Sequence, residues 1–425
     1  MSLFNNIIAA LLFLTLTRVD SAYRREVLQA QESAAVDGED CPGRGSLQEY
    51  ADYFDKQLRT QTLLFWYDKL DVENGGFDLD PDGKHIVAQS RLIWLFSYTH
   101  LKGFNADGVD SLNAAAAGFE FVSSKMRDPV HGGYYWSVDK QGNVQDDRKM
   151  MYGQSFVLYA FTTYFKASGD PKGKELAMEL FQTLVDKAQD TTTGLGGWFE
   201  QFTADWTVLS QGDTPLSQPG SKTHGATIHF MESLTDLLLV TGNPRVRAVL
   251  AQVVDKDIRL FFPPDPDEFV TRIDFSGNSI GRLDHYGYGF EYAWLRIEAQ
   301  RALGRSLNWD DYDRYTRKMI EKGIDAKSGG IFDAESLVWW AQAEVMSGVA
   351  VDKAFRNGSE YEDVLLRLMR FVECAFVDPK DGIWRWGVNS DGSIQDDAKF
   401  NKWKAGFHDT RGMVKFVKAY KAVSK

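Results

Sequence analysis

The chain has 425 residues, with 48 Lys or Arg against 60 Asp or Glu, so its formal net charge is −12 at pH 7. This acidic balance argues against a protein that binds nucleic acid or an anionic membrane, because no excess of cationic side chains is available to neutralise phosphates. The two cysteines are too few for a disulfide-rich scaffold, a structural zinc cluster or an iron–sulfur site. The 12 Trp, 17 Tyr and 28 Phe indicate either a very large core or an aromatic-lined cleft.

An apolar segment lies close to the start of the chain. Residues 7–17 (IIAALLFLTLT) carry no charge, and Arg18 follows them, with the small residues Ser21 and Ala22 a little further on. This run is shorter than the roughly 20 apolar residues that span a bilayer, and it suits the core of a secretory signal peptide. We therefore predict a signal peptide over residues 1–22, with an uncleaved anchor as the alternative. The protein would then be secreted or lie in the lumen of the secretory pathway, without a membrane segment once the signal is cleaved.

The segment that follows is polar and contains glycine. We interpret residues 23–45 as a linker or propeptide and residues 46–425 as a single domain. In a secretory compartment Cys41 and Cys374 could form a disulfide bond, and the alternative is a buried free thiol at Cys374 with a loose one at Cys41. Asn357 begins the Asn-Gly-Ser sequon in a polar segment, so it is a candidate glycosylation site.

A short motif recurs along the rest of the chain: two glycines and then a large apolar residue. It occurs as Gly75-Gly76-Phe77, Gly132-Gly133-Tyr134, Gly196-Gly197-Trp198 and Gly329-Gly330-Ile331, with a degenerate copy at Asp381-Gly382-Ile383-Trp384. One copy is missing from the long interval before the fourth occurrence, and the loop Phe261–Gly281, with its prolines and glycines, lies where that copy belongs. The sequence therefore contains six units of roughly 55–70 residues, a size typical of repeated supersecondary modules.

Helical patterns fill the segments between these loops. Apolar residues recur at three- and four-residue spacing over Asp110–Met126, Tyr152–Ser168, Lys174–Gln189, Gly225–Thr241 and Tyr292–Leu303. Each unit is thus predicted to be a helix, a glycine–aromatic loop with a short β-hairpin, and a second helix. Six such helical hairpins can close into an all-α (α/α)6 barrel whose inner helices line a cavity, and an open α-solenoid is the alternative. We favour the closed barrel, because polar and aromatic residues recur at the start of the helix after each loop.

These recurring side chains are the candidate site residues. They are ionisable and aromatic groups that stand where helices around a filled core would carry Leu or Ala: Arg91, Tyr152, His229, Glu232, His285, Tyr288, Glu291, Trp340, Glu344, Trp403, His408 and Arg411. Taken one at a time, each has an ordinary structural interpretation, such as a hydrogen-bonded core histidine. Together they suit a neutral polyol, because aromatic rings cover the C–H face of a sugar while carboxylates and guanidinium groups bind its hydroxyls.

The sequence offers little to a metal ion or a nucleotide. His229 and Glu232 lack a matching second pair, and the His-Glu-x-x-His pattern is absent. No P-loop or Rossmann glycine motif follows a strand, so nucleotide chemistry has no support. We expect no metal, no cofactor and no nucleic acid, and a mono- or oligosaccharide as the partner.

Six collinear blocks over about residues 46–420 resemble the N-acylglucosamine 2-epimerase family, which includes cellobiose 2-epimerases and mannose isomerases. The blocks are Gly75–Phe77 leading to Ser90-Arg91, and then residues 152–156 (YGQSF), 229–232 (HFME), 291–295 (EYAWL), 339–344 (WWAQAE) and 402–411 with Trp403, His408 and Arg411. The resemblance implies the (α/α)6 barrel, a monomer or homodimer, and removal of a proton next to the carbonyl of an open-chain sugar. The enediolate is then protonated at C2 to give the epimer or at C1 to give the ketose, without a metal or a nicotinamide.

The resemblance also implies roles for individual residues. His408 becomes one acid/base group, Arg91 a clamp on the developing oxyanion, and His229 the residue that aids ring opening or polarises the carbonyl. Other candidates would hold the sugar and orient the histidines: Tyr152, Glu232, Glu291, Trp340 and Trp403.

Two positions depart from the family pattern. Unit four of the family usually holds Gly-His-x-x-Glu, whose His is the second acid/base group, but this chain has Tyr288 there. Unit three usually has Asn four residues before His229, where this chain has Gly225. A free tyrosine, with a pKa of about 10, is a poor base at neutral pH and a reasonable acid. The second role therefore falls to Tyr288 or to His285, three residues earlier.

Three activities are compatible with these residues. The first is a secreted sugar epimerase or aldose–ketose isomerase that uses His408 with Tyr288 or His285. The second is a polysaccharide lyase or glycoside hydrolase on the same barrel, since a Tyr/His pair can drive β-elimination and carboxylates such as Glu232 and Glu291 can cleave a glycosidic bond. The third is a carbohydrate-binding protein that has lost turnover. We favour the first, an isomerase.

Overall fold

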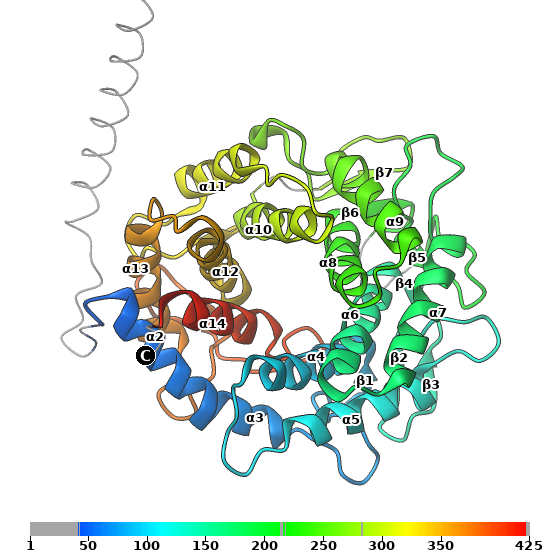
Figure 1. Ribbon diagram of the computed structural model, residues 1–425, viewed down its shortest axis with the longest axis horizontal. Coiled ribbons are helices and arrows are strands. Elements are labelled where there is room, and N and C mark those ends of the chain that lie inside the picture. Colours follow the sequence, from blue (N-terminus) through cyan, green and yellow to red (C-terminus); the bar gives the residue numbers. More distant parts are fainter. Residues whose placement is uncertain (1–40, 42, 213–215, 217, 282–283, 422–425) are drawn as a thin grey trace, which may run out of the picture.

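The computed structural model describes residue 41 and residues 43–212, 216, 218–281 and 284–421. The predicted signal peptide, and the predicted linker up to residue 40, lie outside these residues. The described chain forms a ring of helices in two concentric layers (Figure 1). None of the helices in the described segments is long and apolar enough to cross a membrane.

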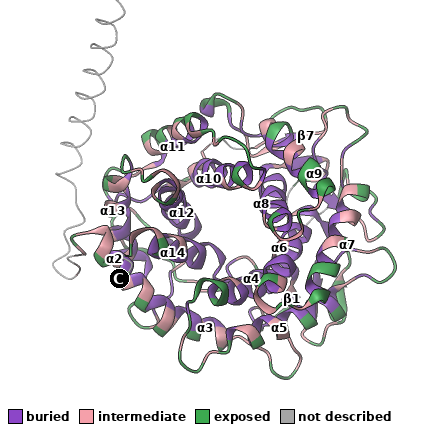
Figure 2. Cartoon of the chain, in the orientation of Figure 1, coloured by how far each residue is buried: buried purple, intermediate pink, exposed green. Residues whose placement is uncertain are grey.

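The inner layer is a closed circle of six helices, one from each unit. They are α4 (Ile86–Lys102), α6 (Met151–Ser168), α8 (His224–Thr241), α10 (Tyr286–Ala302), α12 (Trp339–Arg356) and α14 (Phe407–Tyr420). Each inner helix contacts the next one along the chain, and α14 packs against α4, so the circle closes. Most of their residues are buried (Figure 2). This arrangement confirms the (α/α)6 barrel and rules out an open solenoid.

The outer layer covers the inner one. Its helices are α2 (Leu47–Gln57) continued by a π-helical turn (Leu58–Thr62) and α3 (Leu63–Tyr67), α5 (Ser111–Phe121) with a π-helical turn (Val122–Met126), α7 (Pro171–Lys187), α9 (Pro244–Asp255), α11 (Trp309–Gly323), and α13 (Glu362–Phe371) with a π-helical turn (Val372–Phe376). They are amphipathic, and α13 buries Leu365, Leu368 and Met369 on one side. The helix α7 starts three residues before the predicted Lys174, because Asp170 caps its end and Pro171 fits its first turn.

Short antiparallel strands occupy the loops that lead to the inner helices. They are β1 (Lys84–His85), β2 (Ser137–Val138), β3 (Val144–Asp146), β4 (Lys149–Met150), β5 (Gln201–Phe202), β6 (Ser221–Thr223), β7 (Arg272–Asp274), β8 (Phe332–Asp333), β9 (Ser336–Val338), β10 (Gly387–Val388) and β11 (Ile394–Asp396). The sheets have the orders β1-β2-β3, β11-β10-β9-β8, β4-β5 and β6-β7. Hairpins such as β2–β3 were expected, but β1–β2 and β9–β10 also join the loops of neighbouring units. The unit-four loop adds two 3-10 turns, Asp257–Leu260 and Pro266–Glu268.

The repeated motif has one backbone geometry. A single antiparallel bridge joins the end of each outer helix to the large apolar residue of the motif, as in Leu70–Phe77, Arg127–Tyr134, Gln189–Trp198, Ile324–Ile331 and Val377–Trp384. In the unit without a glycine pair, the amide of Val270 donates to the carbonyl of Phe261 at 2.9 Å. The sixth copy therefore lies inside the predicted loop Phe261–Gly281. Gly76 illustrates why glycine recurs, since its φ is +70° and a Cβ there would lie 2.6 Å from Gln89 Oε1.

The helix α10 begins at Tyr286, six residues before the predicted start. Gly287 and Gly289 interrupt the apolar pattern in this first part. A Cβ on Gly287 would lie 2.8 Å from the ring of Trp340, and one on Gly289 would lie 2.4 Å from Met319. The two glycines thus allow α10 to approach its neighbours closely. Packing, and not the spacing of apolar residues, therefore determines where this helix begins.

The start and the end of the described chain meet. A disulfide joins Cys41 to Cys374, with Cα atoms 5.8 Å apart. Beside it, Arg44 forms an ion pair with Glu373 at 2.9 Å. The helix α2 also packs against α14 (Figure 1). These contacts fasten the segment before the first unit to the last unit.

Candidate active site

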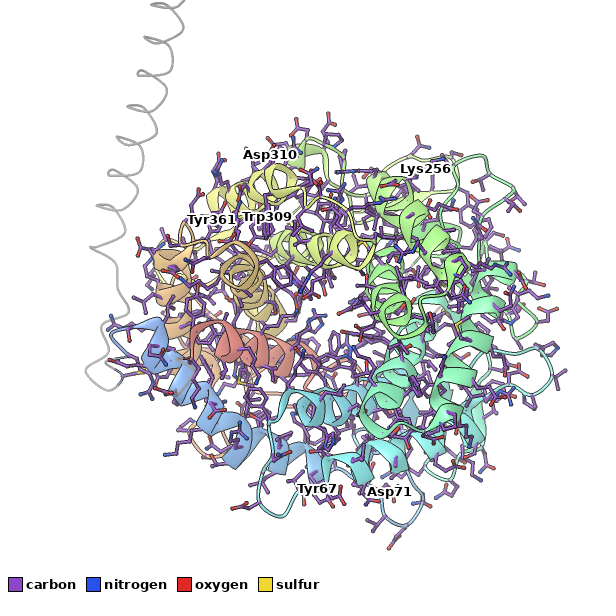
Figure 3. All side chains as sticks on the ribbon, in the orientation of Figure 1. Tyr67, Asp71, Lys256, Trp309, Asp310 and Tyr361 are labelled. Atoms are coloured by element: carbon purple, nitrogen blue, oxygen red, sulfur yellow. A yellow bond between two sulfur atoms is a disulfide. The ribbon has the colours of Figure 1, made fainter. Side chains whose placement is uncertain are left out.

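A cavity of about 340 Å³ opens at the end of the ring where the inner helices begin. Side chains from the inner helices extend toward the middle of the ring (Figure 3). Nine of the predicted site residues line the cavity: Arg91, Tyr152, His229, His285, Tyr288, Glu291, Trp340, Trp403 and His408. The structure thus brings together residues from all six units that are far apart in the sequence.

The rim of the cavity is built in the same way in four of the units. The first amide of an inner helix donates to a carbonyl in the loop of the following unit. The pairs are Ile86 to Trp136 (3.0 Å), Met151 to Glu200 (2.8 Å), His224 to Thr271 (3.1 Å) and Trp339 to Trp386 (3.0 Å). The acceptors Trp136, Glu200 and Trp386 each stand two residues after the apolar residue of their motif. The loops therefore cap the preceding helices and fix the first turns that carry the site side chains.

Several site residues were not predicted, and two share this loop position. Glu200 and Arg272 line the cavity, and Asp333 hydrogen-bonds two residues that line it. Glu200 and Asp333 each stand two residues after the apolar residue of their motif, and this repeat position is the signal that would have found them. His224, the first residue of α8, also lines the cavity.

A buried arginine lies behind the cavity wall. Arg411 is 1% exposed and is surrounded by carboxylates. Its guanidinium donates to Glu291 Oε1 at 3.0 Å and to Glu344 Oε1 at 2.6 Å, and it also pairs with Glu232. It packs over the ring of Trp294, 4.7 Å from the ring centre. The predicted substrate-binding residues Glu232, Glu344 and Arg411 are therefore not among the lining residues, and they support the residues that are.

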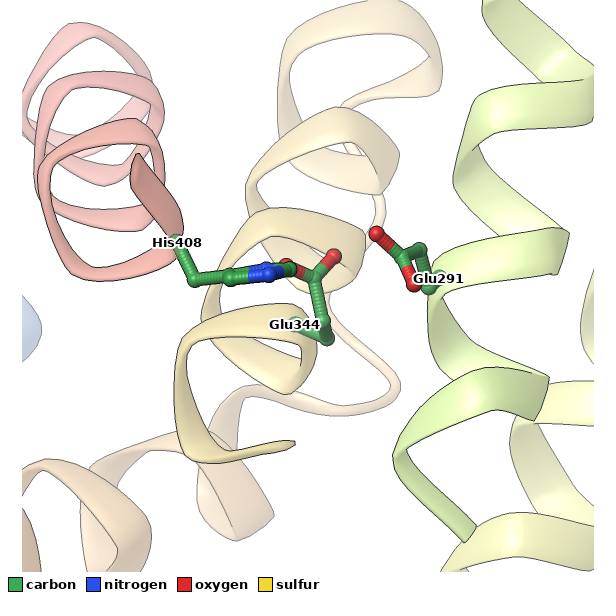
Figure 4. A group of neighbouring side chains, drawn as sticks. All are labelled: Glu291, Glu344 and His408. Carbon is green, nitrogen blue, oxygen red and sulfur yellow. The ribbon is translucent and has the colours of Figure 1, made fainter. Parts of the chain in front are cut away.

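Two of these carboxylates orient histidines. His408 Nδ1 lies 2.7 Å from Glu344 Oε1, and His229 Nδ1 lies 3.1 Å from Glu232 Oε2. Figure 4 shows the imidazole of His408 beside the carboxylate of Glu344. Because each Nδ1–H donates to a carboxylate, each Nε2 is left as a proton acceptor.

Burial and charge set the protonation states of this cluster. Burial lowers the pKa of His408 to about 3, against the opposing effect of Glu344, and burial also lowers the pKa of His229. Burial raises the pKa of Glu291 to about 8, with the neighbouring charge of Glu344 as the second cause. For Glu344, burial is outweighed by the charge of Arg411 and the bond to His408, so its pKa falls to about 2. At neutral pH the imidazole of His408 is thus a neutral base held by an ionised carboxylate.

A second arginine faces this base. Arg91 Nη2 donates to the hydroxyl of Tyr152 at 2.9 Å and lies 3.5 Å from His408 Nε2. Its Nη1 donates to the carbonyl of Trp403, and the guanidinium lies 4.5 Å from the ring centre of Phe156. These contacts fix a cation next to the atom that would accept a proton, which suits a developing oxyanion.

The two positions that depart from the family pattern both line the cavity. The ring of Tyr288 stacks on Trp340 with centroids 4.5 Å apart, and its centroid lies 3.9 Å from that of the His224 ring. Burial, followed by the charge of Asp333, raises the pKa of Tyr288 well above 10, so this hydroxyl keeps its proton at neutral pH. Gly225 offers no side chain to the cavity.

Three residues of the cluster could in principle hold a metal ion. Glu291, Glu344 and His408 each offer one ligand atom, and these atoms lie within 4.8 Å of one another. The guanidinium of Arg411 already binds Oε1 of both carboxylates. A divalent cation would have to displace that charge, so the group fits proton transfer better than metal binding.

A closed ring of six helical hairpins with a base and a cation facing one cavity defines an (α/α)6-barrel enzyme. Residues 66–261 match the family model of N-acylglucosamine 2-epimerase (GlcNAc 2-epimerase). The chain is similar to the cellobiose 2-epimerase of Ruminococcus albus (26% identity, covering 84% of this chain and 95% of the relative) and to that of Dictyoglomus turgidum (24%, covering 85% and 97%). Its fold is similar to the solved structure of cellobiose 2-epimerase from Spirochaeta thermophila, with a TM-score of 0.79 and 27% identity over 88% of this chain and 97% of that one. Over most of its length the chain is similar to proteins of the N-acylglucosamine 2-epimerase family, and these similarities support a sugar epimerase or isomerase.

Proposed function

We propose that this protein is a secreted sugar 2-epimerase or aldose–ketose isomerase that acts on an open-chain sugar through an enediolate. The observation that carries the proposal is the neutral imidazole of His408, whose Nε2 faces the cavity beside the Arg91 guanidinium. A base next to a fixed cation suits removal of a proton from carbon with charge developing on an adjacent oxygen.

In the proposed step, His408 Nε2 takes the proton from C2 of the sugar. The C–H electron pair forms the C1=C2 double bond, and the negative charge moves to O1, where Arg91 stabilises it. Return of a proton to the other face of C2, with C1=O1 re-formed, gives the epimer. Delivery of a proton to C1, with C2=O2 formed and the O2–H proton passed to O1, gives the ketose. His229, oriented by Glu232, would assist ring opening.

A carbohydrate substrate is supported by the family relatives and by the lining of the cavity. The relatives named above are cellobiose 2-epimerases. Rings of Trp340, Trp403 and Tyr152 border the cavity, and such rings can pack on the C–H face of a sugar. Similarity to these epimerases favours this activity over a lyase, a glycoside hydrolase or a protein without turnover.

The test is proton exchange in deuterated water. The purified protein is incubated with mannose, glucose, N-acetylmannosamine and cellobiose, and 1H NMR follows the C2 proton and any new sugar. We expect loss of the C2 signal together with an epimer or a ketose from at least one sugar. An unsaturated product absorbing in the ultraviolet would instead indicate a lyase, and saturable binding without exchange would indicate a binding protein.

Secretion has separate support. The apolar run at residues 7–17 suits a signal peptide, and the disulfide Cys41–Cys374 suits an oxidising compartment. Asn357 ends α12 and is exposed, so its sequon is accessible to glycosylation. Expression of the full chain in a eukaryotic secretory host should yield protein in the medium that begins after residue 22. The variant Asn357→Gln should run at lower mass if this site is glycosylated, and retention of residues 1–22 would support an anchor.

A further inference from the structure

The strongest unassigned group at the cavity is His285, which lies at its mouth. We infer that His285, oriented by Asp333, is the second acid/base group of the reaction, acting in place of the histidine that Tyr288 replaces. The inference rests on the proposed function and adds to it the group that protonates the face of C2 opposite to His408.

Both the backbone and the side chain of His285 are fixed. An antiparallel bridge pairs His285 with Asp333, and the amide of Ala334 donates to the carbonyl of Asp284 at 2.8 Å. His285 Nδ1 lies 2.5 Å from Asp333 Oδ1. The Nδ1–H thus donates to a carboxylate, and Nε2 is the ring nitrogen that remains for proton transfer in the cavity. This is the arrangement that Glu344 gives to His408.

The two histidines approach the cavity from different sides. His285 immediately precedes α10 and His408 lies in the first turn of α14, with α12 between these helices in the ring (Figure 1). Trp340 from α12 connects them: its Nε1 donates to Asp333 Oδ2 at 3.2 Å, and its ring centre lies 5.9 Å from that of His408. A sugar lying against Trp340 would therefore have one imidazole at each of two edges.

The neighbours of His285 are less suited to the role. Tyr288 holds its proton tightly, because burial and the Asp333 charge raise its pKa. His224 Nδ1 donates to the carbonyl of Thr271 at 2.9 Å, and burial lowers the pKa of His224 to about 3. A neutral imidazole whose Nδ1–H donates to a carbonyl carries no proton on Nε2, so it cannot act as an acid through that atom. Among these three groups, His285 is the one that hydrogen-bonds a carboxylate, which can stabilise an imidazolium.

The proton and electron balance needs no further reactant. His408 Nε2 takes the C2 proton and becomes an imidazolium, while the C–H pair forms C1=C2 and charge develops on O1. The O1 electrons then re-form C1=O1, and the C1=C2 pair takes the proton from His285 Nε2–H on the opposite face. His285 ends neutral and His408 protonated. Solvent resets both, and the reverse reaction uses them in exchanged roles.

The test separates exchange at C2 from inversion at C2. His285→Asn and wild type are incubated in deuterated water with mannose, N-acetylmannosamine and cellobiose, and NMR follows both C2 deuteration of the starting sugar and formation of the epimer. In the variant, His408 still removes and returns a proton, so deuteration should stay within about tenfold of wild type. Inversion should fall by about 100-fold or more, the usual contribution of a positioned acid or base.

Two controls keep the result specific. His131→Asn removes a histidine that also lies beside an aspartate, with Nδ1 3.3 Å from Asp128 Oδ2, but outside the cavity. This variant should exchange and invert like wild type. Tyr288→Phe removes the competing hydroxyl but keeps the ring that lines the cavity, so any loss should affect exchange and inversion alike and not inversion alone. Thermal melting of all variants checks that they fold.

A further variant addresses Asp333 as a positioning residue. Asp333→Asn keeps an acceptor but loses the charge that supports an imidazolium, so inversion turnover should fall while C2 deuteration persists. A purely structural role would lower both rates together. Asp333→Glu, which restores the charge, should recover part of the inversion.

Each outcome has one meaning. Wild-type inversion by His285→Asn, loss of deuteration together with inversion, or selective loss of inversion in Tyr288→Phe would each overturn the assignment and leave the proposed function standing. A wild-type protein that neither exchanges nor converts any of the sugars would overturn the proposed function, and the assignment with it.

Discussion

Two histidine–carboxylate pairs at one cavity differ in their surroundings. His408 and Glu344 lie 2.7 Å apart, their side chains are 7% and 0% exposed, and Arg411 binds the same carboxylate. His285 and Asp333 lie 2.5 Å apart with side chains that are 24% and 16% exposed. The local geometry is alike, but one pair is enclosed in a charge network and the other lies at the mouth.

The difference indicates a division of labour. Burial holds the imidazole of His408 neutral, which makes it ready to accept a proton. The greater exposure of His285 gives water access to its ring, so a proton given to substrate can be replaced from solvent. A carboxylate partner therefore orients each imidazole. The deeper burial of His408 keeps it neutral, so it is the histidine that first accepts a proton.

The largest effect is expected at the buried pair. His408→Asn removes the base itself, so both C2 deuteration and product formation should fall by about 100- to 10,000-fold. His285→Asn should lose inversion alone, which is what distinguishes the two pairs. NMR in deuterated water measures both rates, and deuteration near the wild-type rate in His408→Asn would contradict the assigned base.

Removal of the buried cation should mainly affect folding. Arg411→Met leaves three buried carboxylates without their partner, and we expect the free energy of unfolding to fall by about 3–5 kcal/mol. At the mouth, Asp333→Asn should cost about 1 kcal/mol or less, since that pair is partly exposed. Urea unfolding midpoints compare them. Arg245→Met, whose partner Asp186 is 52% exposed, serves as a surface control, and equal losses in all three variants would refute the contrast.

The smallest effect is expected at Glu200, a buried carboxyl outside the two histidine–carboxylate pairs, and it depends on pH. Burial raises the pKa of Glu200 to about 7, partly offset by a hydrogen bond from Thr223. The unfolded chain releases this proton near pH 4.5, so wild-type stability should fall between about pH 4.5 and 7, by at most about 3 kcal/mol. Glu200→Gln should therefore gain stability over wild type at pH 8 but little at pH 4.

Urea midpoints at the two pH values measure this difference. Glu73→Gln, on an exposed loop, provides the matched substitution. An equal gain for Glu200→Gln at both pH values would mean that folding does not raise the pKa of this carboxyl.

The repeat motif made the architecture predictable, because each hairpin must bury a face against its neighbour and the loops kept a recognisable glycine pattern. The first turns of the inner helices were found in the same way, and nine of the predicted residues line the cavity. The early start of α10 was missed because Gly287 and Gly289 carry no apolar signal. Only the packing of Trp340 and Met319 against them explains the helix there.

The parts of the site that escaped prediction depend on contacts between units. Asp333 and Glu200 stand in loops, and their proximity to the cavity follows from strand pairing and caps that sequence spacing does not reveal. The protonation states of the site carboxyls could not be predicted from the sequence either. The contrast between Glu291, with a pKa of about 8, and Glu344, with a pKa of about 2, depends on burial and on the position of one guanidinium.

The closeness of the two ends of the described chain makes this ring a candidate for circular permutation. Cys41 is bonded to the final unit, and Lys421 at the other end reaches Asp55 of α2 at 2.7 Å. A short peptide could join these neighbouring ends, and new termini could then be opened in an outer connection such as the Gly103–Asp110 turn. Such a circular permutant would retain every helix-to-helix interface, so the order in which the six modules are translated is incidental to the finished enzyme.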